Sequence, residues 1–373
     1  MKNIKSIFGL AFLCFLIISN SIVLSDEKPN ENPTPSELYL LGLKYECGYG
    51  VKQDYLKAKE MYEKAAESGL AKAMVSLGDL YSYGNGVIQD YTKAKVWYQK
   101  AADLGDSDAM VDLGYCYFKG NGCIQDYSKM KDWYEKAVSL GNSTAMFRIG
   151  QLYYFGYSVP KNVLKAKEWF EKSAKLDNAE ALYSLGCMYD SGTGVVQDYK
   201  KAKEYFEKAS ALKHTGAMVN LGLMYCLGLG CEKDYSKMKD LYEKAAELGN
   251  SEAMFKIGGL YYFGDSVDQD YKKAKEWFEK AVVLGNSSAM TLLGDMYENG
   301  DGVIQDYSKA RELYEKAAEL NNSGAMILLA DLYFRGKGCP QNISLAKNWL
   351  KKAADLGNRI AIDKLNELGS YNK

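Results

Sequence analysis

The sequence predicts an all-α protein, a solenoid of about nine two-helix repeats followed by a half repeat. Two observations lead to this prediction. The 373-residue chain aligns with itself at an offset of 36 residues from Ser36 onward, without an insertion or deletion. Gly and Tyr recur at fixed positions of this period, and 30 of the 35 glycines occupy only four of them. A chain of this length rarely forms one hydrophobic core, whereas stacked repeats grow without needing one.

The first 25 residues have the layout of a secretory signal peptide. Lys2 and Lys5 precede an apolar run over residues 7–18, and small residues follow before Asp26. An uncleaved anchor is the alternative, but the continuous apolar run is short for a membrane span. We expect cleavage, no transmembrane span afterwards, and a secreted or periplasmic protein, with the endoplasmic-reticulum lumen as the alternative location. Residues 26–35 hold three of the five prolines and are expected to form a flexible leader.

The first half of each repeat is predicted to be an amphipathic helix. In the second repeat one helix face with i, i+3, i+4, i+7 spacing is formed by Met74, Leu77, Gly78 and Tyr81. Gly84 follows in a column that holds Gly in all nine repeats, as expected where a helix end needs a positive φ. Because Gly78 is inside the helix, we expect it to let a neighbouring helix approach closely.

The second half of each repeat is predicted to be another helix. In the second repeat Asp90 is its expected N-cap, and residues 91–102 should bury Ala94, Tyr98 and Ala101. The predicted solenoid covers residues 36–373, and a capping helix over 361–369 closes it. The predicted repeat limits are 37–72, 73–108, 109–144, 145–180, 181–216, 217–252, 253–288, 289–324 and 325–360.

The composition argues against several functional classes. Since 47 Lys and Arg balance 48 Asp and Glu, no basic field is available for nucleic acid. A single His leaves little room for catalytic triads or His-rich metal sites. Ser128 with Lys131, repeated as Ser236 with Lys239, matches the Ser-x-x-Lys motif of penicillin-recognising enzymes, but the companion motifs are absent. We therefore predict no catalytic residue, no cofactor site and no metal site.

The repeat resembles a known family. Over residues 73–105 the string Ala-Met-x-x-Leu-Gly-x-x-Tyr-x-x-Gly-x-Gly-Val-x-x-Asp-Tyr-x-Lys-Ala-x-x-Trp/Tyr-Tyr-x-Lys-Ala-Ala-x-x-Gly is similar to the Sel1-like repeat, and the resemblance extends over residues 36–369. It implies a right-handed α/α superhelical solenoid, related to tetratricopeptide arrays, with a concave groove. It also implies a non-catalytic adaptor with a protein or peptide partner, associated with membranes only through that partner. Two alternatives stay open: a β-lactam-binding or hydrolysing protein, as proposed for cysteine-rich Sel1-like secreted proteins, and an endoplasmic-reticulum quality-control adaptor.

Candidate binding residues are those that vary between repeats on the first helix. They occupy the columns of Leu40, Leu43 and Cys47, away from the Gly/Tyr face, and one neighbouring column. Aromatic residues gather there in the third, fourth and seventh repeats, which suits binding of an extended peptide or a protein edge, although the rings could equally cover seams between repeats. The candidates are Tyr83, Tyr115, Phe118, Lys119, Arg148, Gln151, Tyr154, Phe155, Lys256, Tyr262, Phe263, Asp295 and Arg335.

The mature chain would hold seven cysteines, an odd number. The cysteine-rich branch of the family implies pairs eight residues apart, at columns that here hold Ala66 and Met74. We expect free thiols, and the alternatives are Cys116–Cys123 and Cys226–Cys231 bridges within one repeat.

Overall fold

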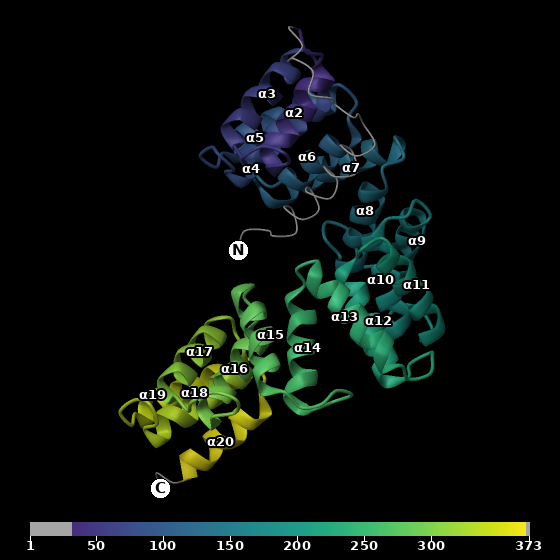
Figure 1. The fold of residues 1–373 in the computed structure, drawn as a ribbon. Coiled ribbons are helices and arrows are strands. Elements are labelled where there is room, and N and C mark those ends of the chain that lie inside the picture. Colours follow the sequence, from purple (N-terminus) through teal and green to yellow (C-terminus); the bar gives the residue numbers. More distant parts are fainter. Residues whose placement is uncertain (1–31, 371–373) are drawn as a thin grey trace. The chain divides into compact units, whose positions relative to one another are not determined.

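The computed structural model describes residues 32–370, and these residues form α-helices in repeating pairs without a β-strand (Figure 1). They belong to two compact units. Unit 1 extends to Leu212 and unit 2 begins at Lys213. The predicted signal peptide and residues 26–31 of the predicted leader lie outside the described residues. None of the described helices is long and apolar enough to cross a membrane.

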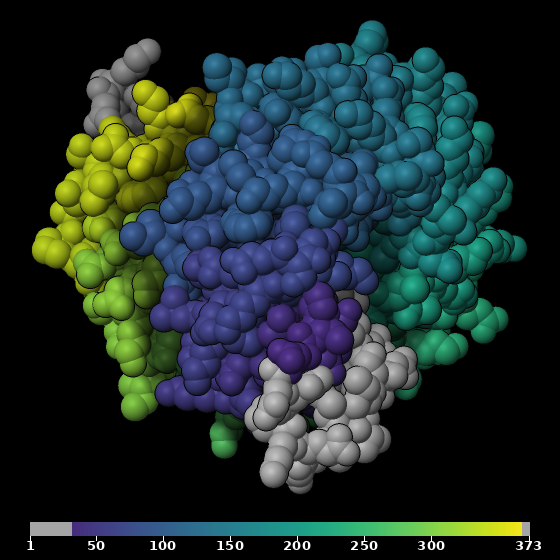
Figure 2. Space-filling view, turned by 90° about the horizontal axis from the view of Figure 1, so that it is seen from above, coloured from purple at the N-terminus to yellow at the C-terminus, as the bar shows by residue number. Residues whose placement is uncertain are grey.

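Unit 1 contains five repeats of two helices each. The first helices are α2 (Pro35–Cys47), α4 (Ala71–Tyr83), α6 (Ser107–Lys119), α8 (Ser143–Phe155) and α10 (Ala179–Ser191). The second helices are α3 (Tyr55–Glu67), α5 (Tyr91–Asp103), α7 (Tyr127–Ser139), α9 (Val163–Ala174) and α11 (Tyr199–Ala211). Each helix packs mainly on its neighbours in sequence, and α6 also contacts α8. The purple, blue and teal surfaces of this unit accordingly follow one another in chain order (Figure 2).

Unit 2 contains four repeats and a last helix. The first helices are α12 (Thr215–Leu227), α14 (Ser251–Phe263), α16 (Ser287–Asn299) and α18 (Ser323–Arg335). The second helices are α13 (Tyr235–Glu247), α15 (Tyr271–Val283), α17 (Tyr307–Glu319) and α19 (Ile343–Asp355), and α20 (Arg359–Ser370) packs on α19. In both units the first helices therefore begin two residues before the predicted starts of all nine repeats.

The N-terminal boundary differs from the predicted leader. Pro35 is the first residue of α2, and Thr34 is its N-cap. The Glu37 carboxylate accepts a hydrogen bond from the Thr34 N–H at 2.7 Å, and the Thr34 hydroxyl accepts one from the Glu37 N–H at 3.3 Å. This capping box recruits two residues that the proline content assigned to the leader, because proline is well tolerated at the first position of a helix.

Local caps set the helix limits much as the sequence predicts. Each first helix ends at a glycine in the left-handed conformation, such as Gly84 with φ 72°. Each second helix begins after an Asp or Asn N-cap. The Asp90 carboxylate, for example, accepts from the N–H groups of Thr92 and Lys93, both at 3.0 Å. These bonds involve near neighbours in sequence, which is why the pattern is readable from the chain alone.

The core of each repeat is a glycine on the first helix facing an aromatic ring on the second. A β-carbon built on Gly78 would lie 2.4 Å from Cε1 of Tyr98, and the same conflict at 2.4–2.5 Å occurs in eight repeats. Tyr98 is buried, as are Ala94 and Ala101 beside it. The expected close approach at the helical glycine is therefore found, and the partner that needs the space is the ring of the same repeat.

A polar ladder joins neighbouring repeats inside each unit. The Asn142 side chain is buried; its Nδ2 donates to Asp108 Oδ1 at 2.8 Å and to Ser107 Oγ at 3.1 Å in the preceding repeat. Its Oδ1 accepts from the Ala145 N–H at 2.9 Å and caps its own helix. One side chain thus satisfies a helix end and links two repeats. In unit 2, Asn250 makes the equivalent bond to Thr215 Oγ1 at 3.0 Å.

The structure shows no disulfide bond among the seven cysteines of the described residues. Cys123 Sγ lies 3.6 Å from the Cys116 carbonyl oxygen, and Cys231 Sγ lies 3.7 Å from that of Met224. These thiols sit over the C-terminal carbonyls of the first helix, and the two alternative bridges are not formed.

Candidate binding face

The candidate residues lie on one side of the first helices. We call this side the variable face and define it as the columns that contain Leu40, Leu43, Glu46 and Cys47. Phe155, Phe263 and Tyr83 are the most exposed rings of the candidate set, with 53 %, 60 % and 47 % of their surface accessible. The other candidates on this face range from half-buried to exposed.

Unit 1 brings six rings of repeats three and four together in one cluster. We call it the ring cluster; it consists of Tyr115, Phe118, Tyr127, Tyr154, Phe155 and Tyr157. Phe118 is its centre, with ring centroids 6.3 Å from Tyr115, 6.0 Å from Tyr127 and 5.5 Å from Tyr157. Phe155 lies 5.5 Å from Tyr157 and 5.0 Å from Tyr154. The rings of α6, α7, α8 and the connector after α8 thus form one continuous aromatic surface.

Polar groups border the ring cluster. The Arg148 guanidinium lies 6.0 Å from the Tyr115 ring centroid, and its Nη1 donates to Gln151 Oε1 at 3.0 Å. Arg148 Nε is buried and has no hydrogen-bond partner among the described residues. Lys119 Nζ lies 5.3 Å from the Phe118 ring centroid. Two predicted candidates, Arg148 and Lys119, are therefore cations close to rings, and a third, Gln151, is linked to the cluster through its hydrogen bond with Arg148.

One candidate ring belongs partly to the core. Tyr154 is half-buried and its ring centroid lies 6.3 Å from that of Phe170, the ring that faces Gly150. Phe155, the next residue, points to the exposed side of the same helix end. Of the two residues, Phe155 is accessible to a partner, whereas Tyr154 packs against both Phe155 and the core ring Phe170.

Carboxyl groups line the variable face next to the ring cluster. Asp79 accepts a hydrogen bond from Tyr98 Oη at 2.7 Å, and burial raises its pKa to about 6. Burial, followed by repulsion from Asp79, Asp108 and Asp106, raises the pKa of Asp112 well above its usual value, while Arg148 opposes this shift. Burial and the two carboxyls also raise the pKa of Tyr83. Burial therefore disfavours the charged form of each of these three groups.

The first repeat has a related acid. Tyr62 Oη donates to Glu46 Oε2 at 2.5 Å, and Glu46 is buried. Burial raises the pKa of Glu46 to about 7, against the lowering effect of the Tyr62 hydrogen bond.

The candidates of unit 2 form a smaller group. Tyr262 Oη lies 3.0 Å from carboxylate oxygens of both Asp295 and Asp301, and its ring lies 4.9 Å from that of Phe263. Burial and these two carboxylates raise the pKa of Tyr262. Lys256 pairs with Glu252 at 3.4 Å, and Arg335 pairs with Asp331 at 3.0 Å. These last two pairs are ordinary i,i+4 helix pairs and bring no further candidates together.

Sequence reasoning missed four residues that matter here. Tyr127 begins the second helix of its repeat, and Tyr157 and Asp301 belong to the connectors between helices, so all three lie outside the columns that supplied the candidates. Asp112 lies in the column of Leu40 but was not among the candidates. Variation among repeats in the connector column after the glycine would have been the usable signal for Tyr157 and Asp301.

The Ser-x-x-Lys pairs do not have the geometry of an activated nucleophile. Ser128 and Ser236 are exposed in the first turn of their helices. Lys131 Nζ is paired with Glu135 at 3.5 Å, and Lys239 Nζ with Glu243 at 3.8 Å. Each ammonium group is therefore drawn to a glutamate four residues later. Within residues 32–370 no group of three His, Cys, Asp or Glu side chains is arranged to hold a metal ion.

Comparisons with known proteins agree with this architecture. The family model described as the Sel1 repeat matches nine consecutive segments, 38–70, 71–106, 107–142, 143–178, 179–214, 215–250, 251–286, 287–322 and 323–358. These segments begin, as the helices do, at 71 and 107 rather than at 73 and 109. None of the curated proteins searched matches the chain.

Solved structures give the same result. A Sel1 repeat protein from Oxalobacter formigenes is 30 % identical, with a TM-score of 0.60 over 66 % of this chain and 99 % of that one. The protein c5321, a protective antigen of uropathogenic Escherichia coli with an SLR fold, is 27 % identical, with a TM-score of 0.53 over 97 % of this chain and 83 % of that one. With nine matched repeats and the same helix pairs, the chain belongs to the Sel1 repeat family.

Proposed function

We propose that this protein is an exported scaffold that binds a protein or peptide partner on the variable face of unit 1 and carries out no catalysis. The ring cluster is the observation that carries the proposal. Its six rings come from two repeats, and several present exposed edges although the cores of both repeats are already filled by Tyr134 and Phe170. Aromatic surfaces of this kind supply much of the binding energy in protein interfaces.

The charges around the rings favour a partner with basic side chains. Asp79 and Asp112 lie on the same face as Tyr83, and burial raises the pKa of both carboxyl groups, with Arg148 opposing the shift at Asp112. A lysine or arginine of the partner would stabilise the ionised carboxylates and lower these pKa values again. The proposed ligand is therefore an extended segment with apolar and basic residues, held by the rings and by these carboxylates.

Export rests on the signal-peptide layout of residues 1–25. N-terminal sequencing of protein recovered from the exported fraction should begin at Asp26 or within a few residues of it. A mature protein that starts at Met1 and remains with the cytoplasmic fraction would contradict this part of the proposal.

The binding site can be tested by selection from a displayed peptide library against the full mature chain. Peptides selected on the wild-type protein should lose at least about tenfold in affinity for a Phe155→Ala/Tyr157→Ala variant. The matched control is Ile124→Ala, because Ile124 is 90 % exposed in the third repeat but lies outside the ring cluster. Selected peptides that bind all three proteins equally would exclude the ring cluster as the site.

The proposal that the protein carries out no catalysis is tested with a fluorescent β-lactam. Because Lys131 is paired with Glu135, we expect no more labelling of the wild-type chain than of a Ser128→Ala/Ser236→Ala variant. Labelling that depends on either serine would replace the scaffold proposal with the β-lactam alternative.

A further inference from the structure

The last repeat departs from the pairing of glycine and aromatic ring that the other eight share. Ala330 stands in the glycine column, and Leu350 stands in the column of the buried rings. The two changes belong together, because the β-carbon of Ala330 would collide with a ring at position 350. The leucine side chain is shorter than that of tyrosine or phenylalanine, so the side chain at position 350 of α19 extends less far toward the variable face.

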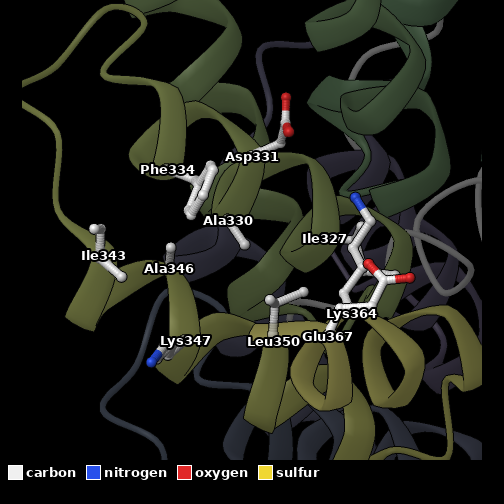
Figure 3. A pocket seen from close by; sticks show the side chains of 10 residues that line it. All are labelled: Ile327, Ala330, Asp331, Phe334, Ile343, Ala346, Lys347, Leu350, Lys364 and Glu367. Carbon is white, nitrogen blue, oxygen red and sulfur yellow. The ribbon is translucent and has the colours of Figure 1, made fainter. Parts of the chain in front are cut away.

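A cavity of about 570 Å³ lies at this place, between α18, α19 and α20 (Figure 3). Six of its ten lining residues are apolar: Ile327, Ala330, Phe334, Ile343, Ala346 and Leu350. The other four, Asp331, Lys347, Lys364 and Glu367, are charged. A cavity of this size and lining is typical of sites that bind a small ligand or one anchoring side chain.

Phe334 shows what kind of group the cavity lacks. In repeats four and seven the aromatic residue at this position packs against rings from its own second helix: Tyr154 on Phe170 at 6.3 Å, and Tyr262 on Tyr271 at 5.5 Å and on Phe278 at 6.2 Å. In the last repeat those two ring columns hold Ile343 and Leu350. Phe334 has 41 % of its surface accessible and makes no ring contact within the described residues.

The four charged residues that line the cavity are Lys347 and Lys364 against Asp331 and Glu367. Asp331 is already paired with the neighbouring Arg335 at 3.0 Å, which leaves the two lysines facing Glu367 alone. Lys364 and Lys347 form no ion pair with any residue that the structure describes. Lys364 lies on the α20 wall, across the cavity from Phe334 and Ile343 (Figure 3).

We propose that this cavity binds an aromatic side chain of a partner peptide, with an acidic residue beside that side chain. The ring would pack against Phe334 above Leu350, where the chain's own rings lie in other repeats, and the carboxylate would pair with Lys364. This second site lies wholly within unit 2 and does not depend on the function proposed for unit 1.

The probe is the peptide acetyl-Gly-Asp-Phe-Asp-Gly-amide with 4-fluorophenylalanine at its centre, added to the full mature chain and followed by fluorine NMR. We expect saturable broadening and shift of the fluorine signal at micromolar to millimolar concentration. Acetyl-Gly-Asp-Ala-Asp-Gly-amide should not displace it. The version with Asn in place of both Asp residues should bind about threefold more weakly, as should the original peptide on Lys364→Gln.

The decisive variant is Ala330→Gly/Leu350→Phe. It restores the pair found at Gly258 and Phe278, so it should fold as the other repeats do, and its ring should fill the cavity and weaken binding at least tenfold. Phe334→Ala is a second variant that should weaken binding by the same factor. Because Phe334 is exposed, this variant should fold like the wild type. The proposal is overturned if the probe does not bind at millimolar concentration, if the alanine peptide competes equally, or if both variants bind like the wild type.

Discussion

A β-carbon on Gly114 would lie 2.5 Å from Cε1 of the Tyr134 ring. Tyr134 is buried and comes from the second helix of the same repeat, so the absent side chain at position 114 is what allows α6 and α7 to pack at their observed distance. The same contact in eight repeats explains why a helical protein tolerates so many glycines inside helices, where each costs about 1 kcal/mol of helix stability.

Gly114→Ala should destabilise the protein by about 1–3 kcal/mol, because the tyrosine ring must move out of a filled core. Gly114→Ala/Tyr134→Leu should recover part of this loss, since it recreates the Ala330 and Leu350 pair of the last repeat. Urea unfolding followed by circular dichroism gives both values. Additive losses in the double variant would show that the two positions are not coupled as described.

Glu46→Gln should change the pH dependence of stability. The pKa of Glu46 is raised from 4.5 to about 7, so the native state holds its proton more tightly than the unfolded chain does. The contribution that this tighter proton binding makes to the free energy of unfolding is fully present below about pH 4.5 and is lost as the pH rises through about 7. The amide that replaces the carboxyl group keeps a partner for the Tyr62 hydroxyl and does not ionise.

The variant and the wild type should therefore have similar stability at pH 4.5, and the variant should be more stable at pH 8 by on the order of 2 kcal/mol. Thermal unfolding at both pH values measures the difference. A constant offset between the two proteins at all pH values would contradict the assignment of the raised pKa to Glu46.

Tyr154→Ala and Phe155→Ala should have opposite effects on stability and binding. Tyr154 packs on the core ring Phe170, so its loss should cost about 1–3 kcal/mol. Phe155 is 53 % exposed, so its truncation should cost less than about 1 kcal/mol while weakening partner binding. Unfolding curves of the two single variants decide this. Equal destabilisation would show that both rings serve mainly to hold repeat four together.

Asn142→Asp should separate the two roles of this side chain. The carboxylate can still accept from the Ala145 N–H and cap α8, but it cannot donate to Asp108, whose oxygen lies 2.8 Å from Asn142 Nδ2. Two carboxylates would face each other there, and we expect a loss of about 1–3 kcal/mol at pH 7 that shrinks below pH 4. A loss that does not change with pH would instead point to the cap.

The fold could be predicted from the sequence because its signals are local and repeated nine times. The N-cap Asp90, the helix-end Gly84 and the buried Tyr98 all act within one repeat, so each copy confirms the others. The start of α2 was missed because Thr34 and Pro35 differ from the residues in the same columns of later repeats, such as Asn142 and Ser143, and their proline-rich surroundings are typical of a leader.

The binding face was only partly predictable. Its residues are neighbours across repeats, as Phe118 is to Tyr157, and nothing in a 36-residue period says which variable side chains will meet. Tyr154 and Phe155 differ in role because they point to different sides of α8, so that the Tyr154 ring is half-buried and the Phe155 ring is exposed. The cavity beside Leu350 could not be predicted from the sequence, because this requires knowing that Ala330 and Leu350 line the same space.

The most direct test of the central claim is calorimetric titration of one selected peptide into the wild type, Phe155→Ala/Tyr157→Ala and Ile124→Ala. The ring cluster predicts a dissociation constant at least about tenfold higher for the double variant, an unchanged value for Ile124→Ala, and closely similar thermal stability for all three proteins. An unchanged dissociation constant for the double variant would contradict the assignment of partner binding to this face.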